Sequence, residues 1–270
     1  MIRSKPAARS PVQFFGRCFR RLKDLAVTLV LWSYFTAGFV VLFAPFYLVV
    51  LVAFKDRKSA FQHLNHLFFK GFFKLCRLII PRHKWEIQSQ LSAIRSSIIV
   101  CNHLSYLDSI LLISLYPKHT TIAKERLFAI PIFGMVVKHA GYIPSSGRGR
   151  YAELLLNSLE AINANLEQGG NIIIFPEGTR SRDGRVGQLR KGAFKIAKYC
   201  KAPIQVLKVG NTEKLFPPGK FLFNTCIDNT ISLKQVGELT PQDENGKYDA
   251  KHLMAQFHAL LDGKSHSVPG

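Results

Sequence analysis

The sequence contains thirty consecutive residues without a formal charge, from Leu25 to Phe54. About 20 apolar residues in a helix cross the hydrocarbon core of a bilayer, so this run is long enough to span a membrane. A secretory signal has a shorter apolar core of about 7–15 residues and a small-residue cleavage site. The run therefore predicts a retained membrane anchor, with a buried core helix as the less favoured alternative.

Basic residues flank this run on both sides. Those before it are Arg3, Lys5, Arg9, Arg17, Arg20, Arg21 and Lys23, and those after it are Lys55, Arg57 and Lys58. Because basic loops stay on the cytoplasmic side, the two flanks disagree about a single crossing. Pro45 can either kink one tilted helix or mark the turn of a re-entrant hairpin. We favour the hairpin, which places both flanks on one side.

The segment that follows has one apolar and one basic face at helical spacing. The apolar positions are Phe61, Leu64, Phe68, Phe72, Leu75 and Ile79, and the polar ones are Gln62, His66, Lys70, Lys74 and Arg77. This pattern is typical of a helix lying in a membrane interface, and a helix packed on a soluble core is the alternative. We therefore expect a basic segment over 1–24, an anchor with an interfacial helix over 25–80, and a soluble domain over 81–270.

From Pro81 onwards, short β-branched apolar runs alternate with amphipathic segments. The predicted strands are 98–101, 120–123, 171–175 and 204–209; the predicted helices are 107–115, 152–166, 192–200 and 249–261, with a loop over 213–219. Such alternation is typical of α/β folds. The predicted fold is a mostly parallel central sheet with helices on both faces, preceded by an N-terminal membrane-embedded helical segment.

The chain is strongly basic, with 37 Lys and Arg residues against 17 Asp and Glu and a formal charge of +20. This charge favours acidic partners, which include anionic lipids, phosphorylated metabolites and nucleic acid. The five cysteines are scattered without metal-binding spacing, which indicates reduced thiols in a cytosolic domain.

His103 comes just after the predicted strand 98–101, where ligand sites gather in open α/β sheets. Asp108 follows five residues later, and five residues correspond to about 500° of helix rotation. We therefore expect His103 on the turn and Asp108 in the next helix. The carboxylate can then orient the imidazole and leave its second nitrogen as a base. A purely structural hydrogen bond is the alternative, and no third ligand nearby supports a metal site.

A second cluster, Phe175-Pro176-Glu177-Gly178-Thr179-Arg180-Ser181, follows the predicted strand 171–175. Pro and Gly favour a tight turn there. Arg180 offers a planar fork of donors to a phosphate, assisted by Thr179 and the backbone N–H groups of the loop. Lys124 and Arg148 add cations near apolar turns. A solvated basic loop is the alternative.

Four blocks in this order resemble the glycerolipid acyltransferase family, in particular its bacterial 1-acylglycerol-3-phosphate acyltransferases. Residues 102–108 resemble the His-x4-Asp block, 141–148 the second block, 175–181 the third and 202–206 the fourth. The first and third blocks are the most specific. The second differs, because the family usually places arginine six residues after its glycine, where this chain has Gly147.

The resemblance implies that His103 is the general base on a glycerol hydroxyl and that Asp108 orients it. It implies that Arg180 and Arg148, with Lys124, hold the phosphate, and that Glu177, Gly178 and Thr179 belong to the same substrate-binding loop. The hydroxyl attacks an acyl thioester directly. The donor is acyl-CoA or acyl carrier protein, and neither a metal nor another cofactor is required.

We therefore expect a membrane-bound enzyme that forms phosphatidic acid at the inner (cytoplasmic) membrane, with its catalytic domain on the cytoplasmic side. Its expected partners are anionic membrane lipids, a lyso-lipid acceptor and the acyl donor, but no nucleic acid. Lyso-ornithine lipid or a lysophospholipid with a larger headgroup is the alternative acceptor. A non-enzymatic basic membrane adaptor is the alternative from another class, and it leaves the two clusters unexplained.

Overall fold

A seven-stranded sheet forms the centre of the computed structural model, which describes residues 11–145, 152–181, 186–241 and 249–263. The strands are β1 (His83–Ile87), β2 (Ile98–Cys101), β3 (His119–Ala123), β4 (Ile143–Pro144), β5 (Asn171–Ile174), β6 (Ile204–Gly210) and β7 (Asn229–Leu239). Their order is β1-β7-β6-β2-β5-β3-β4. Neighbouring strands are parallel except for the antiparallel pair β6 and β7, so the predicted mostly parallel sheet is confirmed.

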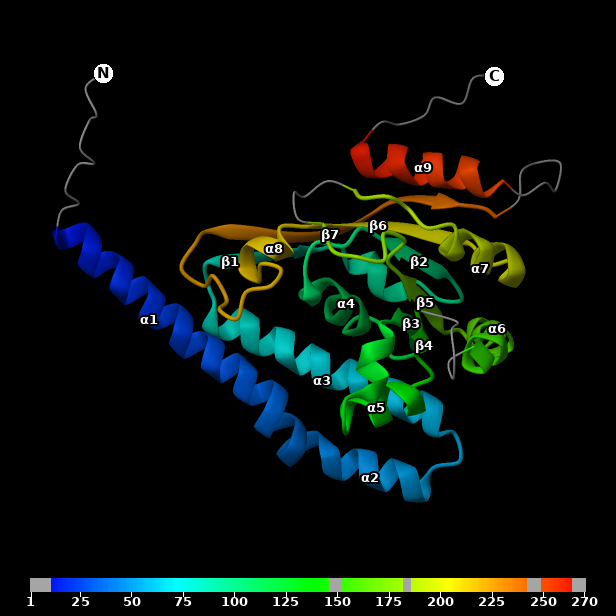
Figure 1. Ribbon diagram of the computed structural model, residues 1–270, viewed down its shortest axis with the longest axis horizontal. Coiled ribbons are helices and arrows are strands. Elements are labelled where there is room, and N and C mark those ends of the chain that lie inside the picture. Colours follow the sequence, from blue (N-terminus) through cyan, green and yellow to red (C-terminus); the bar gives the residue numbers. More distant parts are fainter. Residues whose placement is uncertain (1–10, 146–151, 182–185, 242–248, 264–270) are drawn as a thin grey trace.

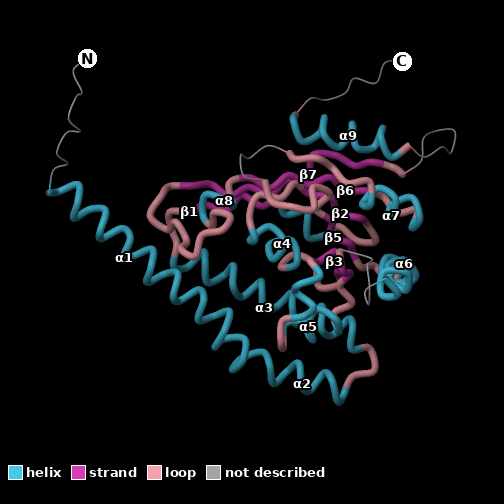
Figure 2. The backbone as a smooth tube through the Cα atoms, viewed as in Figure 1, coloured by secondary structure: helices cyan, strands magenta, loops and turns pink. Residues whose placement is uncertain are grey.

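Helices cover both faces of the sheet (Figure 1). The α-helices are α1 (Pro11–Ser33), α2 (Ala44–Ala53), α3 (Arg57–Ile79), α4 (Tyr106–Ile113), α5 (Phe133–His139), α6 (Ala152–Glu167), α7 (Gly192–Cys200), α8 (Thr212–Leu215) and α9 (Ala250–Asp262). A π-helical segment joins α1 to α2 (Tyr34–Phe43), and two 3₁₀ turns occupy Ser89–Ala93 and Glu125–Ala129. Figure 2 shows α9 on one side of the sheet and α3 and α4 on the other.

The central strand β2 shows why this part of the sequence reads as a continuous apolar run. Ile98 and Val100 pack with residues of α6, α7 and α9, whereas Ile99 and Cys101 pack with α3 and α4. All four side chains are fully buried. A parallel strand covered on both faces needs apolar residues at every position, because successive side chains point to opposite faces.

The N-terminal apolar run forms one continuous helix, Gly16–Ala53, rather than a hairpin that turns at Pro45. The Ala44 N–H bonds to Phe39 O, five residues back, and Pro45 stands at the start of α2. Because Pro has no N–H to donate, the π-helical register before it lets the helix continue. The chain reverses only after Ala53, and Asp56 caps α3 by accepting from Ser59 N. The favoured hairpin at Pro45 is therefore wrong.

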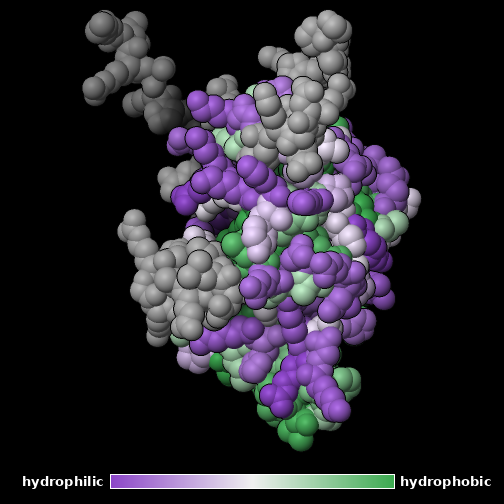
Figure 3. All heavy atoms as spheres, turned by 90° about the vertical axis from the view of Figure 1, so that its right-hand side faces the viewer, coloured by the Kyte–Doolittle hydropathy of each residue, from purple (hydrophilic) through white to green (hydrophobic). Residues whose placement is uncertain are grey.

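This helix is the one helix in the described part of the chain that is long and apolar enough to cross a membrane, by length and composition. In its most apolar 18-residue window, 11% of the residues are buried inside the protein. A core helix of a soluble protein would be mostly covered. Figure 3 shows hydrophobic residues at the lower tip of the molecule, where α2 ends.

Helix α3 buries most of its apolar residues against other parts of the protein, as in the alternative of a helix packed on a core. Phe61 packs with Tyr47 of α2, and Phe72 packs against Tyr34 and Phe35 of the π-helical segment. On the other side, Gln62 and His66, which were expected to face solvent or headgroups, are buried. The exposed stripe that remains is mainly basic and contains His63, Leu67, Lys70, Lys74 and Arg77. The α3 helix thus joins the N-terminal helix to the sheet.

The connection between β6 and β7 packs against helix α1 and forms hydrogen bonds with it. Trp32 stacks on Phe221 with ring centroids 5.9 Å apart, and its Nε1 donates to Phe221 O. Further along, Phe223 N donates to Thr28 Oγ1, and Thr225 N donates to Asp24 Oδ1. Since α1 lies in the N-terminal segment and the connection in the sheet domain, these contacts fix the two parts to each other.

The sequence analysis does not predict three of the strands, which are β1, β4 and β7. The 11-residue strand β7 alternates buried and partly exposed positions, so Ile231 and Leu233 are buried while Thr230 and Ser232 are not. This mixed pattern lacks the continuous apolar run that marks β2, β5 and β6. The predicted loop at 213–219 also begins with a short helix, α8.

Candidate active site

The residues predicted to carry chemistry follow strands that end at one edge of the sheet. His103 follows β2, the loop 175–181 follows β5, and Lys124 follows β3. These strands are parallel neighbours in the order β2-β5-β3, so their carboxyl ends lie together. In open α/β sheets this edge is where ligands bind. The fold thus brings together clusters about seventy residues apart in the sequence.

The Asp108 carboxylate contacts the His103 imidazole, as the sequence predicts. His103 lies on the turn, and Asp108 is the third residue of α4, which begins after the N-cap Ser105. Nδ1 of His103 lies 3.0 Å from Oδ2 of Asp108. Asp108 is 1% exposed as a residue, whereas the His103 side chain keeps 14% of its surface open. The base is thus accessible and its partner is not.

Asp108 is held by more groups than its histidine. Its Oδ2 accepts from the backbone N–H groups of Leu104 at 2.6 Å and Ser105 at 2.7 Å, and its Oδ1 accepts from the Thr212 hydroxyl. Because all these groups donate, the carboxylate acts as an acceptor, and the proton between it and His103 belongs to Nδ1. Nε2, which has no hydrogen-bonding partner in the described part of the chain, is then free to take a proton.

Two residues that the sequence reasoning did not assign complete this arrangement. Asn102 bonds the backbone of Val209 through both its amide atoms, at 2.8 and 2.9 Å, and so locks the end of β2 to β6. Thr212 follows β6, the neighbour of β2 on its other side. A signal existed for Thr212, because a polar residue just after a predicted parallel strand lies at the same edge as His103.

Glu177 ties the two loops to each other. It is 5% exposed, and its Oε1 and Oε2 accept from the backbone N–H groups of His103 and Gly187, both at 2.9 Å. In return, Ser181 N donates to His103 O at 2.7 Å. Glu177 lies in the predicted substrate-binding loop, but both carboxylate oxygens serve the backbone. These contacts of Glu177 therefore position His103 rather than face a ligand.

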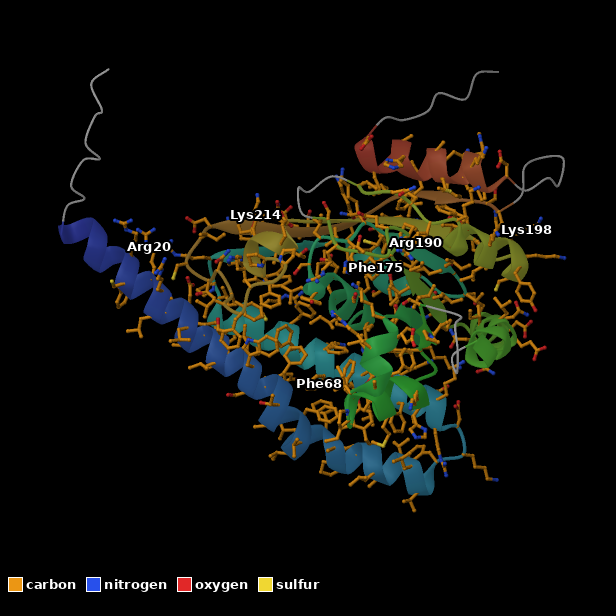
Figure 4. The ribbon with its side chains drawn as sticks, in the orientation of Figure 1. Arg20, Phe68, Phe175, Arg190, Lys198 and Lys214 are labelled. Carbon is orange, nitrogen blue, oxygen red and sulfur yellow. The ribbon has the colours of Figure 1, made fainter. Side chains whose placement is uncertain are left out.

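The turn after β5 needs glycine at position 178. Gly178 has a φ of +67°, and a Cβ there would meet the Arg190 side chain at 2.8 Å. Phe175, at the start of the turn, stacks on the His103 ring with centroids 4.3 Å apart. Figure 4 labels Phe175 and Arg190 near the middle of the molecule. The turn therefore covers one face of the imidazole and exposes Thr179 on its outer side.

Arg180 ends this turn with an unpaired donor. Its guanidinium carbon lies 3.4 Å from the ring centroid of Tyr106. Its Nη1 is buried and has no hydrogen-bond partner among the described residues. An unpaired buried donor costs about 1–3 kcal/mol, so a ligand anion that accepts from it would be favoured. Arg180 thus has a donor that an anion could satisfy.

Of the other two predicted cations, Lys124 and Arg148, the structure describes only Lys124. Lys124 is exposed and follows β3, two strands from β2, which corresponds to a lateral distance of about 10 Å at the usual strand spacing. Arg148 lies outside the described residues. Among the residues that are described, no group of three or more His, Cys, Asp or Glu side chains is placed to hold a metal ion.

Comparisons with known proteins identify relatives of this chain. Residues 82–209, which contain His103, Asp108 and the loop after β5, match the model of the acyltransferase family. A 1-acyl-sn-glycerol-3-phosphate acyltransferase of Saccharomyces cerevisiae is 30% identical over 197 residues, which cover 70% of this chain and 64% of that protein. The chloroplastic enzyme BAT2 of Brassica napus, with the same activity name, is 34% identical over 145 residues, 52% of this chain and 41% of its own.

The chain thus spans about two fifths to two thirds of the length of these relatives. The crystal structure of the 1-acyl-sn-glycerophosphate acyltransferase PlsC from Thermotoga maritima has the same fold, with a TM-score of 0.68, 22% identity, and coverage of 90% of this chain and 96% of that one. With the family model and the sequence relatives in agreement, residues 82–209 of the chain form a domain of the acyltransferase family.

Proposed function

We propose that the protein transfers a fatty acyl chain from an acyl thioester to the sn-2 hydroxyl of 1-acylglycerol-3-phosphate, forming phosphatidic acid. The observation that carries this proposal is the His103–Asp108 pair, tied through Glu177 and Ser181 to the turn that presents Arg180. A base and an anion-binding group side by side suit an acceptor whose hydroxyl lies near a phosphate. The names of the curated relatives support the same reaction.

In the proposed reaction, His103 Nε2 takes the proton of the acceptor hydroxyl while its oxygen attacks the thioester carbonyl. The C–S bond then breaks, and the imidazolium returns the proton to the leaving thiolate. Asp108 holds the ring and stabilises the imidazolium. One C–O bond forms, one C–S bond breaks, and no acyl-enzyme is needed. The donor is acyl-CoA or acyl carrier protein, and no metal or further cofactor takes part.

Arg180 is proposed to bind the acceptor phosphate, with Lys124 and Arg148 as further cations. A guanidinium suits this task because two of its N–H groups can bond one phosphate together. Thr179 is exposed on the same turn, and its hydroxyl can add a donor. Glu177 supports the site by keeping this turn against His103.

The N-terminal helix is proposed to hold the enzyme at the inner membrane, with the catalytic domain on the cytoplasmic side. Its exposed apolar side chains include Val40, Val41, Leu42, Phe46, Leu48, Val49 and Val52. Arg17, Arg20, Arg21 and Lys23 at its N-terminal end can bind anionic headgroups. Membrane attachment would bring the enzyme to a lyso-lipid acceptor that itself resides in the bilayer.

A second acceptor class stays open because the second block departs from the family pattern. The usual arginine position is Gly147, and Arg148 is one residue later. A lyso-ornithine lipid or a lysophospholipid with a larger headgroup would use the same base. The acyl transfer step is common to all these acceptors.

The test is an acceptor panel with the full-length protein in detergent. Lysophosphatidate, lysophosphatidylethanolamine and lyso-ornithine lipid are each supplied with acyl-CoA or acyl carrier protein, and product formation is followed. We expect the highest kcat/KM with lysophosphatidate. Preference for another lyso-lipid would replace the acceptor. Salt-sensitive lipid or nucleic-acid binding without any acyl transfer would indicate the non-enzymatic adaptor instead.

A further inference from the structure

Tyr106 belongs to the first cluster, contacts Arg180 of the second cluster, and has no role in the reaction described above. It is the first residue of α4, three positions after His103, and is 46% exposed. Its ring faces the guanidinium of Arg180, whose central carbon is 3.4 Å from the ring centroid. Cation–π attraction acts within about 6 Å, so this contact lies well inside its range.

The way in which Arg180 is held bears on what it can bind. Among the described residues, no carboxylate forms an ion pair with Arg180. A carboxylate partner would use the N–H groups along the edge of the guanidinium and would compensate its charge. A stacked ring uses the flat face instead and leaves the edge donors available. Tyr106 can therefore restrain Arg180 without consuming the groups that would bind an anion.

One of those edge donors is indeed unused. Nη1 of Arg180 is buried and has no acceptor among the described residues. A buried donor without a partner is unfavourable, and an anionic oxygen at this position would satisfy it. The restraint by Tyr106 and the unpaired Nη1 are separate observations, and both indicate a guanidinium prepared for an anion.

The Tyr106 ring also contacts Phe216, which supports it. Its neighbour Ser105 donates its hydroxyl to Phe216 O at 2.7 Å, and the rings of Tyr106 and Phe216 lie 6.2 Å apart. Phe216 is 5% exposed and stacks on Phe223. Because Tyr106 begins α4 three residues after His103, this support holds the ring that contacts Arg180 close to His103 in the chain.

We propose that Tyr106 is a positioning residue that holds Arg180 so that its free N–H groups face the anionic headgroup of the acceptor. The inference rests on the proposed function and adds a residue that determines acceptor affinity. The phenol hydroxyl is not required, since the ring face makes the contact. A leucine at this position would fill similar space but would offer no π system.

The test compares Tyr106→Leu and Tyr106→Phe in full-length, detergent-solubilised protein, with Tyr199→Leu as the matched control. Tyr199 is an exposed tyrosine on α7, covering the other face of the sheet. We expect Tyr106→Leu to raise the KM for lysophosphatidate about three- to thirtyfold while kcat changes less than about threefold. Tyr106→Phe and Tyr199→Leu should match the wild type within about twofold.

Two further measurements make the result specific. In an Arg180→Ala background, Tyr106→Leu should have no additional effect, because the two residues act as a unit. In the inactive His103→Ala protein, the affinity for a soluble short-chain lysophosphatidate, measured by calorimetry, should fall by the same factor on Tyr106→Leu. This binding measurement separates the two proposals, since it reports the anion site even if no acyl transfer to lysophosphatidate occurs.

The inference is overturned if Tyr106→Leu leaves both the KM and the affinity unchanged while Arg180→Ala raises them. It is equally overturned if Tyr106→Leu is as harmful without Arg180 as with it, or if Tyr106→Phe fails like Tyr106→Leu. If the wild-type protein binds lysophosphatidate in a way that depends on Tyr106 but does not acylate it, lysophosphatidate is not the acceptor. The positioning role of Tyr106 would still hold in that case.

Discussion

The hydroxyl of Thr212 donates to Oδ1 of Asp108, the carboxylate oxygen that does not contact His103. Thr212 is fully buried and begins α8, just after β6, whereas Asp108 belongs to α4. The carboxylate therefore receives donors on both oxygens, and its rotation is fixed by an element from another part of the sheet. This relationship gives the His103–Asp108 pair a support beyond its own turn.

Thr212→Val should lower kcat for acyl transfer about tenfold or more with little change in the KM for the acceptor. Valine keeps the shape but removes a hydrogen bond to a charged group, which is worth about 1.5–3 kcal/mol. Thr212→Ser, which restores the hydroxyl, should recover most of kcat. Steady-state kinetics of the three proteins decides the matter, and equal losses in valine and serine variants would contradict the role.

His103→Ala should abolish acyl transfer and leave the protein folded. Loss of a general base costs about 10²–10⁴-fold, and more when base and orienting group act as a unit. Product formation should fall to background while the circular dichroism spectrum and thermal midpoint stay close to those of the wild type. Near-wild-type turnover in the purified variant would remove His103 from the mechanism.

Glu177→Gln should reduce both activity and thermal stability. A glutamine oxygen can accept from one backbone N–H, but its NH₂ group then meets the other N–H, so one of the contacts to His103 and Gly187 is lost. We expect destabilisation of about 1–3 kcal/mol. Chemical denaturation measures it, and Glu160→Gln, at an exposed position on α6, serves as control. Loss of activity with unchanged stability would instead favour direct contact with substrate.

Stability should decrease as the pH falls below about 6.5, in part because of His119. This residue is fully buried and bonds Tyr142 Oη and Tyr116 O, both at 2.7 Å. Burial lowers its pKa to about 3, since the charged ring loses its solvation. Between about pH 6.5 and 3 the unfolded chain binds a proton that native His119 does not, so the free energy of unfolding falls by up to about 1.4 kcal/mol per pH unit.

The measurement is the thermal midpoint of wild type and His119→Gln at several pH values between about 4 and 7. The variant should show a flatter pH dependence. Burial also lowers the pKa of His66 and His83, but these residues are present in both proteins. The difference between the curves therefore reports His119, and parallel curves would refute its contribution.

Lysine on the exposed face of α2 should weaken membrane binding. Leu48 and Val49 are 60% and 55% exposed, and each lysine near the bilayer centre costs about 2.5–3.5 kcal/mol. Leu48→Lys/Val49→Lys should therefore be recovered less with vesicles in flotation assays. Tyr199→Lys, on the opposite face of the sheet, should float like the wild type. Equal flotation of all three proteins would place the membrane contact elsewhere.

The sequence predicts the parts of this protein that carry strong local patterns. Strands β2, β5 and β6 are buried on both faces and stand out as apolar runs, and the contact between His103 and Asp108 follows from the strand end before it and the helix after it. The spacing of five residues correctly predicts His103 on the turn and Asp108 in α4. It does so because the turn and the helix are adjacent in the chain, so that the contact between the two residues is local.

The rest depends on contacts between distant segments. The position of Thr212 after a strand indicates the same edge of the sheet as His103, but no local pattern indicates its contact with Asp108. Likewise, no local pattern indicates that Tyr106 contacts Arg180 or that Glu177 accepts from the backbone of His103. Gln62 and His66 look like surface residues on α3, yet packing between the N-terminal helix and the sheet buries them. Pro45 suggests a turn, but a π-helical register accommodates it within one helix.

The contacts between the β6–β7 connection and α1 determine what removal of α1 would do to the protein. The same connection carries Thr212 at its start and, further on, the residues that contact Trp32, Thr28 and Asp24. A shortened version that lacks α1, made to gain solubility, would lose the contacts of this connection with Trp32, Thr28 and Asp24. The connection would then be less restrained, and Thr212 would hold Asp108 less firmly. Low turnover in such a truncated protein would therefore reflect damaged catalytic geometry as well as detachment from lipid.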